Sequence, residues 1–181
     1  MTQIILLGGA AGTGKTTVAE ELCRKMNFTH RLATGFIRET LRTATNNKVL
    51  DSHTFSVSDK PPFDHLLEQT KNMKDAINAC INRCSKEGTS FILEGSNLIP
   101  GFIDNKNVTL SIMLYVDDYD THRQMVDGKS HAKRRVSDEE FERTREIQSK
   151  LMELAKKHDV TMIDGSQELS KIIDTIGKML K

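Results

Sequence analysis

The chain has 181 residues, of which 26 are Lys or Arg and 25 are Asp or Glu, so its formal net charge is +1. This length is typical of one domain with a sizeable core, and we expect residues 1–181 to form a single domain. The balanced charge excludes a general attraction to nucleic acid or to an anionic membrane, so any anion site must be local.

The first apolar run, Ile4–Leu7, predicts a buried strand that leads through a glycine-rich loop into a helix, Lys15–Met26. The loop has the pattern Gly-x-x-x-x-Gly-Lys-Thr, in which glycines let backbone N–H groups approach phosphate oxygens. We expect Lys15 to reach the β- and γ-phosphates of ATP as a catalytic residue, and Thr16 to offer its hydroxyl to Mg²⁺. The predicted nucleotide-binding residues are Gly9, Ala10, Ala11, Gly12, Thr13, Gly14, Lys15, Thr16 and Thr17.

A second, weaker strand is predicted at His30–Ala33, followed by a turn at Thr34-Gly35. The next helix, from Phe36 to about Thr43, places Arg38 and Arg42 four residues apart on one face. Two guanidinium groups in this arrangement can bracket a phosphate or a carboxylate, which indicates an anionic substrate. The alternative is that both arginines are solvated helix charges.

Two polar segments, 45–62 and 127–137, are rich in turn-forming residues, and we expect both to be mobile loops beside the site. Between the second and third strands, Phe63–Lys86 places apolar residues at intervals of three and four. This spacing predicts one long helix with a buried stripe that includes Cys80 and Cys84.

The third predicted strand, Phe91–Leu93, ends at Glu94. The carboxylate of Glu94 is therefore expected at the C-terminal edge of the sheet, where ligands of open α/β sheets bind. There it can hold a Mg²⁺-bound water or orient an acceptor hydroxyl, which makes Glu94 a candidate metal ligand and catalytic residue. The alternative is a carboxylate that only caps the next turn. The chain has no Asn-Lys-x-Asp tetrapeptide, which disfavours a GTPase.

The fourth predicted strand, Leu110–Val116, and a short helix from Tyr119 to about Met125 lead into a basic segment. Phosphoryl transfer needs positive charge over the migrating group and exclusion of water, and a mobile basic lid at about 119–137 would supply both. Arg134 in this segment, and Arg145 in the helix after it, are the candidate catalytic arginines. The alternative is a solvated surface or a contact with a polyanion.

The remaining predicted elements are a helix at Asp138–His158, a strand at Val160–Ile163 and a helix at Gln167–Lys181. The alternation of strands and helices predicts right-handed βαβ units and an α/β fold with a five-stranded parallel sheet. The first apolar run is far shorter than the ~20 residues that span a bilayer, and the three cysteines form no Cys-x-x-Cys pair. We expect a soluble, cytoplasmic protein with reduced thiols.

Together these motifs resemble the kinase domain of archaeal 2-phosphoglycerate kinase, within the adenylate-kinase-like P-loop kinases. The segments that carry the resemblance are Gly8–Thr17, Ile37–Glu39, Glu87–Gly101 and Arg145–Gln148. The resemblance implies a three-layer P-loop NTPase fold with strand order 2-3-1-4-5. It also implies ATP and Mg²⁺ as cofactors, and transfer of the γ-phosphoryl group to the hydroxyl of a small phosphorylated acid.

Two positions differ from the usual pattern of that family, which has Asp at the position of Gly35 and His at that of Asn97. The pair Thr34-Gly35 is more similar to the nucleotide-monophosphate-binding turn of adenylate kinases. Both positions lie on the expected acceptor side of the site, where Thr34 and Asn97 join Arg38 and Arg42 as the predicted substrate-binding residues.

Three hypotheses follow from the sequence. The first is an ATP-dependent kinase acting on a small anionic metabolite, with a 2-phosphoglycerate-like acid favoured. The second is a nucleoside or nucleoside-monophosphate kinase, and the third is a regulatory or polyanion-binding protein that binds ATP without acceptor chemistry. For the favoured kinase we expect neither nucleic acid nor membrane as a partner, and the sequence makes no prediction of oligomeric state.

Overall fold

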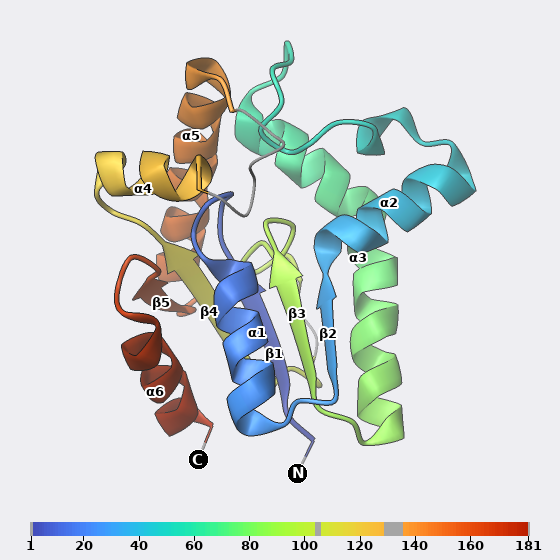
Figure 1. The fold of residues 1–181 in the computed structure, drawn as a ribbon. Coiled ribbons are helices and arrows are strands. Elements are labelled where there is room, and N and C mark those ends of the chain that lie inside the picture. Colours follow the sequence, from blue (N-terminus) through green and yellow to red (C-terminus); the bar gives the residue numbers. More distant parts are fainter. Residues whose placement is uncertain (1, 104–105, 129–135, 181) are drawn as a thin grey trace.

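The computed structural model describes residues 2–103, 106–128 and 136–180. Its centre is a five-stranded parallel sheet with the strand order β2-β3-β1-β4-β5, which confirms the predicted fold. In Figure 1 the strands run side by side, and their C-terminal ends meet at the upper edge of the sheet. The strands are β1 (Ile4–Gly8), β2 (His30–Ala33), β3 (Phe91–Gly95), β4 (Leu110–Tyr115) and β5 (Thr161–Asp164).

Every predicted helix is present, with ends that differ from the prediction by no more than two residues. The agreement comes from clear apolar periodicity within the helices and from recognisable residues at their ends, such as Asn27 and Gly88, which both adopt the left-handed conformation. The helices are α1 (Lys15–Met26), α2 (Thr34–Thr45), α3 (Pro62–Glu87), α4 (Tyr119–Val126), α5 (Asp138–Lys157) and α6 (Leu169–Met179).

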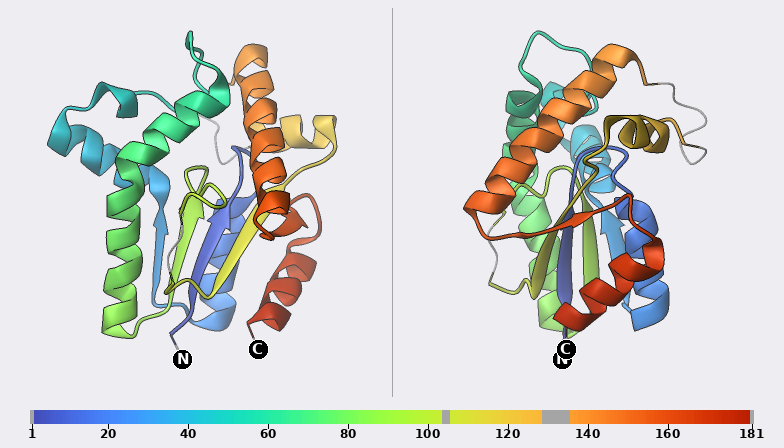
Figure 2. Two further views of the ribbon diagram at one scale, coloured as in Figure 1. Left: turned by 180° about the vertical axis from the view of Figure 1, so that it is seen from behind. Right: turned by 90° about the vertical axis from the view of Figure 1, so that its left-hand side faces the viewer.

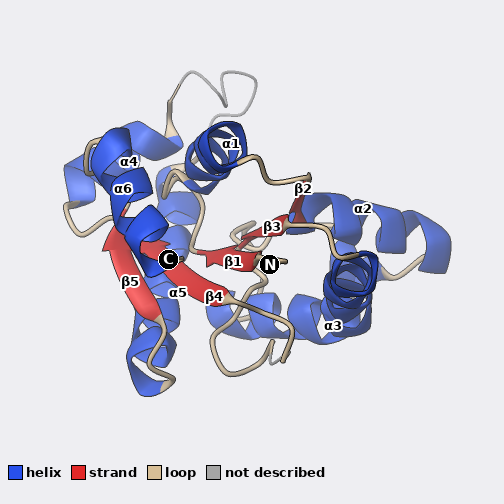
Figure 3. Ribbon diagram, turned by 90° about the horizontal axis from the view of Figure 1, so that it is seen from below, coloured by secondary structure: helices blue, strands red, loops and turns tan. Residues whose placement is uncertain are grey.

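The helices cover both faces of the sheet and form three layers (Figures 2 and 3). Alternate residues of β1 point to opposite faces, as the pleat of a strand requires. Ile5 and Leu7 belong to the apolar cluster under α1 and α6, whereas Ile4 and Leu6 belong to the cluster under α3. The helices α3 and α5 contact each other on this second face. Among the described residues, no helix combines the length and the apolar character that crossing a membrane requires.

The turn expected at Thr34-Gly35 is wrong, because α2 begins at Thr34, directly after the last residue of β2. The chain changes from strand to helix at Ala33, whose backbone is still extended, with φ −93° and ψ 139°. Gly35 lies in the first turn of the helix, where an added Cβ would meet no atom within 4 Å. The glycine that suggested a turn therefore occupies an ordinary helical position.

The segment that joins α2 to α3, residues 46–61, is tied to the rest of the fold. It contains a short 3₁₀ helix, η1 (Lys48–Leu50), and the Leu50 side chain is buried in the core. The amide of Gln69 in α3 donates hydrogen bonds to the carbonyls of Val49, at 3.0 Å, and Ser52, at 2.8 Å. Of the second predicted loop, residues 129–135 lie outside the described part of the chain, so its mobility stays a prediction.

Candidate active site

The phosphate loop lies between β1 and α1, at the C-terminal edge of the sheet (Figure 1). Gly12 and Gly14 have φ of +75° and +82°, which glycine adopts at little cost and other residues rarely adopt. A Cβ at Gly12 would also lie 2.3 Å from Cγ2 of Val126 in α4. The loop is therefore packed closely against α4, and this packing requires glycine.

The Lys15 side chain folds back over the phosphate loop. Its Nζ donates to the Ala10 carbonyl at 2.5 Å and lies 3.4 Å from the Thr13 hydroxyl. Burial lowers the pKa of Lys15 to about 8, and the nearby carboxylate of Glu94 opposes this effect. Because charge-assisted hydrogen bonds to phosphate are stronger than bonds to a carbonyl, this ammonium group can exchange Ala10 for a phosphate oxygen.

Glu94 joins the phosphate loop to the neighbouring strand. Its carboxylate is buried at the end of β3, where Glu94 pairs in register with Leu7 of β1. Oε2 accepts a hydrogen bond from the Thr16 hydroxyl at 2.9 Å, and Oε1 accepts one from Arg31 at 2.9 Å. Thr16 and Glu94, both predicted as metal ligands, therefore lie side by side.

Arg31 was not identified from the sequence. It lies on β2, which pairs with β3, and its guanidinium also lies 3.2 Å from a carboxylate oxygen of Glu20 in α1. The expected strand order already placed the strand that bears Arg31 beside the strand that bears Glu94, but strand order alone does not show which side chain reaches the carboxylate.

A cavity of about 750 Å³ opens above the phosphate loop, a volume within the usual range for small-molecule sites. Besides the loop, residues of segment 46–61 and of the α4 end form its walls. Its lining residues are Ala11, Gly12, Gly14, Lys15, Thr16, Thr17, Glu20, His53, Phe55, Met125, Val126 and Val136.

Thr34 and Asn97, both predicted to bind substrate, contact each other in a buried polar network. The Thr34 hydroxyl donates to Oδ1 of Asn97 at 3.4 Å, and the Asn97 amide donates to the Thr70 hydroxyl at 3.1 Å. Gly95 makes this approach possible, because a Cβ at that position would lie 1.8 Å from the Thr34 hydroxyl oxygen. Neither predicted residue lines the large cavity.

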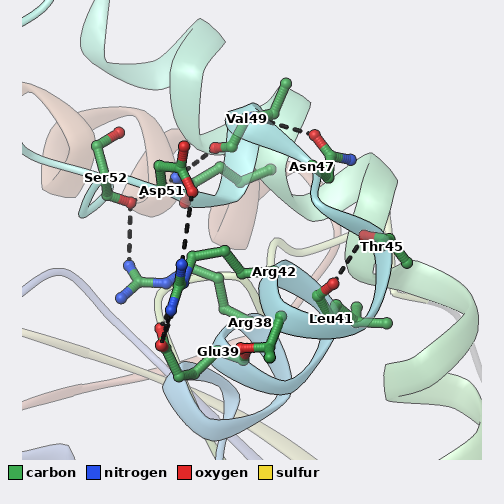
Figure 4. A network of polar contacts seen from close by, with 11 residues as sticks. Arg38, Glu39, Leu41, Arg42, Thr45, Asn47, Val49, Asp51 and Ser52 are labelled. Atoms are coloured by element: carbon green, nitrogen blue, oxygen red, sulfur yellow. Dashed lines mark hydrogen bonds and ion pairs between the residues drawn. The ribbon is translucent and has the colours of Figure 1, made fainter.

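Arg38 and Arg42 lie next to each other on α2 but have different partners (Figure 4). Arg42 donates to both carboxylate oxygens of Glu39. Arg38 is half-buried, donates to the Ser52 carbonyl at 3.1 Å and lies 3.4 Å from Nδ1 of His53. Its Nε has no hydrogen-bond partner among the described residues. Both groups reach adjacent residues of one segment, since Arg42 also lies 3.8 Å from an Asp51 carboxylate oxygen, but among the described residues an ion pair is formed by Arg42 and not by Arg38.

Burial lowers the pKa of Arg38, and the carboxylate of Glu39 opposes this effect. An anion close to this guanidinium would offset the cost of burying it, since opposite charges favour the ionised form. Of the two arginines predicted to bind the acceptor, Arg38 is therefore the better placed to take an additional anionic partner.

Of the two candidate catalytic arginines, Arg134 lies outside the described residues. The Arg145 guanidinium is partly buried and donates to the carbonyls of Val116, at 2.8 Å, and Asp117, at 3.1 Å. It also lies 3.3 Å from Nδ1 of His122. This setting differs from that of an arginine free to swing over a substrate.

His122 of α4 is a second residue that the sequence did not reveal. Its ring is buried, and Nε2 lies 2.8 Å from the Ala11 carbonyl oxygen in the phosphate loop. Burial lowers the pKa of His122, and the contact with Ala11 opposes this effect. Within the described ranges, no group of three or more His, Cys, Asp or Glu side chains gathers as a metal site.

Comparison with known proteins gives both sequence and structural relatives. The sequence profile of the AAA domain family matches residues 5–145. The chain is 30% identical over 191 residues to a 2-phosphoglycerate kinase of Pyrococcus horikoshii, with 96% of this chain and 64% of the relative covered. It is 27% identical over 203 residues to that of Methanothermobacter thermautotrophicus, with 98% and 65% covered. The chain thus spans somewhat less than two thirds of the length of these relatives.

The fold is shared with solved kinase structures at low sequence identity. A shikimate kinase from Acinetobacter baumannii, in complex with shikimate, superposes with a TM-score of 0.60 at 12% identity, covering 99% of this chain and 93% of the other. A gluconokinase from Sinorhizobium meliloti superposes with a TM-score of 0.55 at 12% identity, covering 98% and 91%. At such identities these likenesses concern the fold.

Proposed function

We propose that this chain, which belongs to the AAA domain family over residues 5–145, is an ATP-dependent kinase for a small anionic metabolite. One observation carries the proposal: the Thr16 hydroxyl and the Glu94 carboxylate meet at 2.9 Å, next to the loop that lines a cavity of about 750 Å³. A phosphate loop alone binds a nucleotide. A carboxylate next to its Thr, at the C-terminal edge of the neighbouring strand, adds a place for the metal and the acceptor.

The residues present fit a magnesium–nucleotide complex. Backbone N–H groups of the loop and the start of α1 suit phosphate oxygens, and Lys15 adds a cation. The hydroxyl of Thr16 and the carboxylate of Glu94 are the hard oxygen ligands that Mg²⁺ prefers, directly or through water. Bound there, Mg²⁺ would neutralise charge on the β- and γ-phosphates.

For the acceptor, we propose 2-phosphoglycerate or a similar phosphorylated acid, on the basis of the similarity to 2-phosphoglycerate kinases. In the transfer, the acceptor hydroxyl oxygen bonds to the γ-phosphorus while the bond from that phosphorus to the β–γ bridging oxygen breaks. The hydroxyl proton is released to water, and ADP leaves with the electron pair of the broken bond on its terminal oxygen. We assign Arg38 to the acceptor's negative charge, while Arg42, Arg134 and a substrate role for Thr34 and Asn97 stay predictions.

The test is acceptor-dependent release of ADP from MgATP. The panel contains 2-phosphoglycerate, its isomer 3-phosphoglycerate, nucleosides and nucleoside monophosphates, with the product identified by phosphorus NMR. We expect turnover with 2-phosphoglycerate, loss of turnover in Lys15→Ala, and a loss of at least ~100-fold in Glu94→Gln, since charge stabilisation at the reacting centre is worth factors of this size.

Turnover of a nucleoside monophosphate alone would replace the acceptor assignment with that of a nucleotide kinase. Binding of MgATP without turnover on any member of the panel would refute the kinase proposal. Glu94→Gln activity within a few-fold of wild type would remove Glu94 from the metal or base role.

A further inference from the structure

His122 lies behind the phosphate loop, and its two ring nitrogens have partners that fix its protonation. Nε2 is 2.8 Å from the carbonyl oxygen of Ala11, which can only accept a hydrogen bond, so Nε2 carries a proton. Nδ1 is 3.3 Å from NH1 of Arg145, which can only donate, so Nδ1 carries a lone pair. These two contacts define a neutral imidazole with its proton on Nε2.

The contact with Ala11 determines where the next N–H group points. The Ala11 carbonyl and the Gly12 N–H belong to one planar trans peptide unit, in which the two groups point in opposite directions. A carbonyl held toward His122 therefore aims the Gly12 N–H away from α4. Gly12 lines the large cavity, together with Lys15 and Thr16.

We infer that His122 is a positioning residue for the nucleotide: it holds the Ala11–Gly12 peptide unit so that the Gly12 N–H faces the phosphate chain of ATP, and Arg145 fixes the tautomer that does this. The inference rests on the proposed function for the identity of the anion. It also gives Arg145 a different role, since this arginine acts through His122 and not on the transferred phosphoryl group.

The surroundings of His122 keep the imidazole in place and uncharged. The Phe141 ring of α5 packs edge-on against it, with ring centroids 5.4 Å apart. The charged groups that face it are Arg145 from α5 and Lys15 from the start of α1. Both act with burial to lower the pKa of His122, against the opposing contact with Ala11. Arg145 is itself fixed by two backbone carbonyls and cannot follow a protonated ring.

The experiment measures MgATP binding by calorimetry on the full chain, with three variants. His122→Phe keeps an aromatic ring against Phe141 but removes the N–H that holds the Ala11 carbonyl. Without that contact the Gly12 N–H no longer points at the phosphate chain, and we expect MgATP affinity to fall about ten- to a hundredfold, the range for one hydrogen bond to a charged group. His122→Gln keeps an N–H donor and should recover most of that loss. Phe141→Leu loosens the packing around His122 and around the cavity walls Val126 and Val136 but keeps the N–H donor to Ala11, and should leave MgATP affinity within about threefold.

Steady-state kinetics and NMR separate positioning from a structural role. With a working acceptor, His122→Phe should raise KM for ATP and leave KM for the acceptor unchanged. In the wild-type protein, long-range ¹H–¹⁵N spectra should show the neutral Nε2–H tautomer of His122 at pH 7, with and without MgATP. This second measurement keeps the inference testable even if His122→Phe does not fold.

Three results would overturn the inference: unchanged MgATP affinity in His122→Phe, an equal loss in Phe141→Leu, or a protonated or Nδ1–H form of His122 at pH 7. MgATP binding needs no acceptor, so this outcome is independent of the kinase assay. A chain with no kinase turnover can still lose MgATP affinity in His122→Phe, and an active kinase can bind MgATP normally in that variant.

Discussion

Lys15 occupies an unusual position for a lysine, because among the described residues its ammonium group is hydrogen-bonded to a carbonyl and a hydroxyl. Burial accordingly lowers its pKa to about 8. Lysines of this kind lose their proton within the range of pH at which enzymes are assayed. Binding of a phosphate chain reverses the effect, because negative charge stabilises the protonated form.

The first prediction is that MgATP binding takes up a proton at pH 9. At that pH the free Lys15 is mostly neutral, since its pKa is about 8, whereas the phosphate-bound side chain is charged. Affinity for MgATP should therefore fall as pH rises above about 8. Calorimetry in two buffers of different ionisation enthalpy measures the uptake.

Lys15→Arg provides the control for this measurement, because arginine stays charged at every accessible pH and should bind without proton uptake. Equal uptake in the wild type and in Lys15→Arg would assign the proton to another group.

Arg31 offers a second prediction at this scale. It is the ion-pair partner of Glu94, whose side chain is 3% exposed, and it reaches the 60% exposed Glu20 on its other side. Arg31→Met leaves a buried carboxylate without its cation, and we expect it to lower the free energy of unfolding by about 1–3 kcal/mol. Glu20→Gln, which breaks the exposed half of the network, should cost no more than ~0.5 kcal/mol.

Urea unfolding of the protein without nucleotide tests this difference. The double variant Arg31→Met with Glu94→Gln should recover part of the loss, because it no longer buries an unpaired charge. Similar costs for Arg31→Met and Glu20→Gln would mean that the pair with Glu94 contributes nothing beyond surface charge.

Among the elements, segment 46–61 is held to the fold by side chains of α2, α3 and α5. Gln69 of α3 donates to two of its carbonyls, and Arg143 of α5 donates to the Ser58 hydroxyl at 3.1 Å. Because His53 and Phe55 of this segment line the nucleotide cavity, its position affects the site directly.

We predict that Gln69→Ala loosens segment 46–61, since the partly buried Val49 carbonyl loses its Gln69 donor and the Ser52 carbonyl loses one of two donors, at a cost of about 1–3 kcal/mol. Hydrogen exchange should increase in this segment while the β-strands keep their protection. Asn72→Ala, which removes an exposed contact to Asn47 in the same segment, is the matched control and should change exchange little. Equal exchange in Gln69→Ala and wild type would show that other contacts hold the segment.

The boundaries of the elements could be predicted from the sequence because they depend on local patterns. The strands are short apolar runs that end at Gly, Ala, Tyr or Asp, and α3 ends at Gly88 in a left-handed conformation. The same local reasoning placed Thr16 and Glu94 at one edge. It was wrong at Thr34-Gly35, because a glycine after a strand has the same appearance in a turn and in the first turn of a helix.

Arg31 and His122 could not be predicted, because their roles come from contacts between distant parts of the chain. Arg31 meets a residue 63 positions away, and His122 meets one 111 positions away. Neither lies in a motif, and each depends on the order of strands or on the packing of a helix. Helix α4 was predicted correctly, but periodicity does not say which residue of a helix will touch a loop.

At the scale of the whole molecule, the sheet order explains why one edge carries the site. The strand β1 lies between β3 and β4, so the phosphate loop that follows it is next to Glu94 on one side. On the other side, the α4 helix after β4 supplies His122 and Val126. Ligand binding at this edge joins elements from both halves of the sheet.

We therefore expect MgATP to stabilise the whole fold and not only the loop. A ligand that binds the native state alone raises stability by about 2.7 kcal/mol at a hundredfold excess over its dissociation constant. The transition in thermal denaturation should move upward as one cooperative step, and Lys15→Ala should show little shift. Two separate transitions, only one of them sensitive to MgATP, would contradict the prediction of a single domain.

Segment 46–61 touches both halves of the proposed site at adjacent residues. The Ser52 carbonyl is held by Arg38, whereas His53 and Phe55 line the cavity above the phosphate loop. Because Gln69 also donates to the Ser52 carbonyl, an acceptor that draws Arg38 away would loosen this wall of the nucleotide cavity without freeing it. The two substrates should therefore not bind independently. In bisubstrate kinetics, the KM for ATP should change with acceptor concentration, and a dead-end acceptor analogue should alter the rate at which nucleotide dissociates.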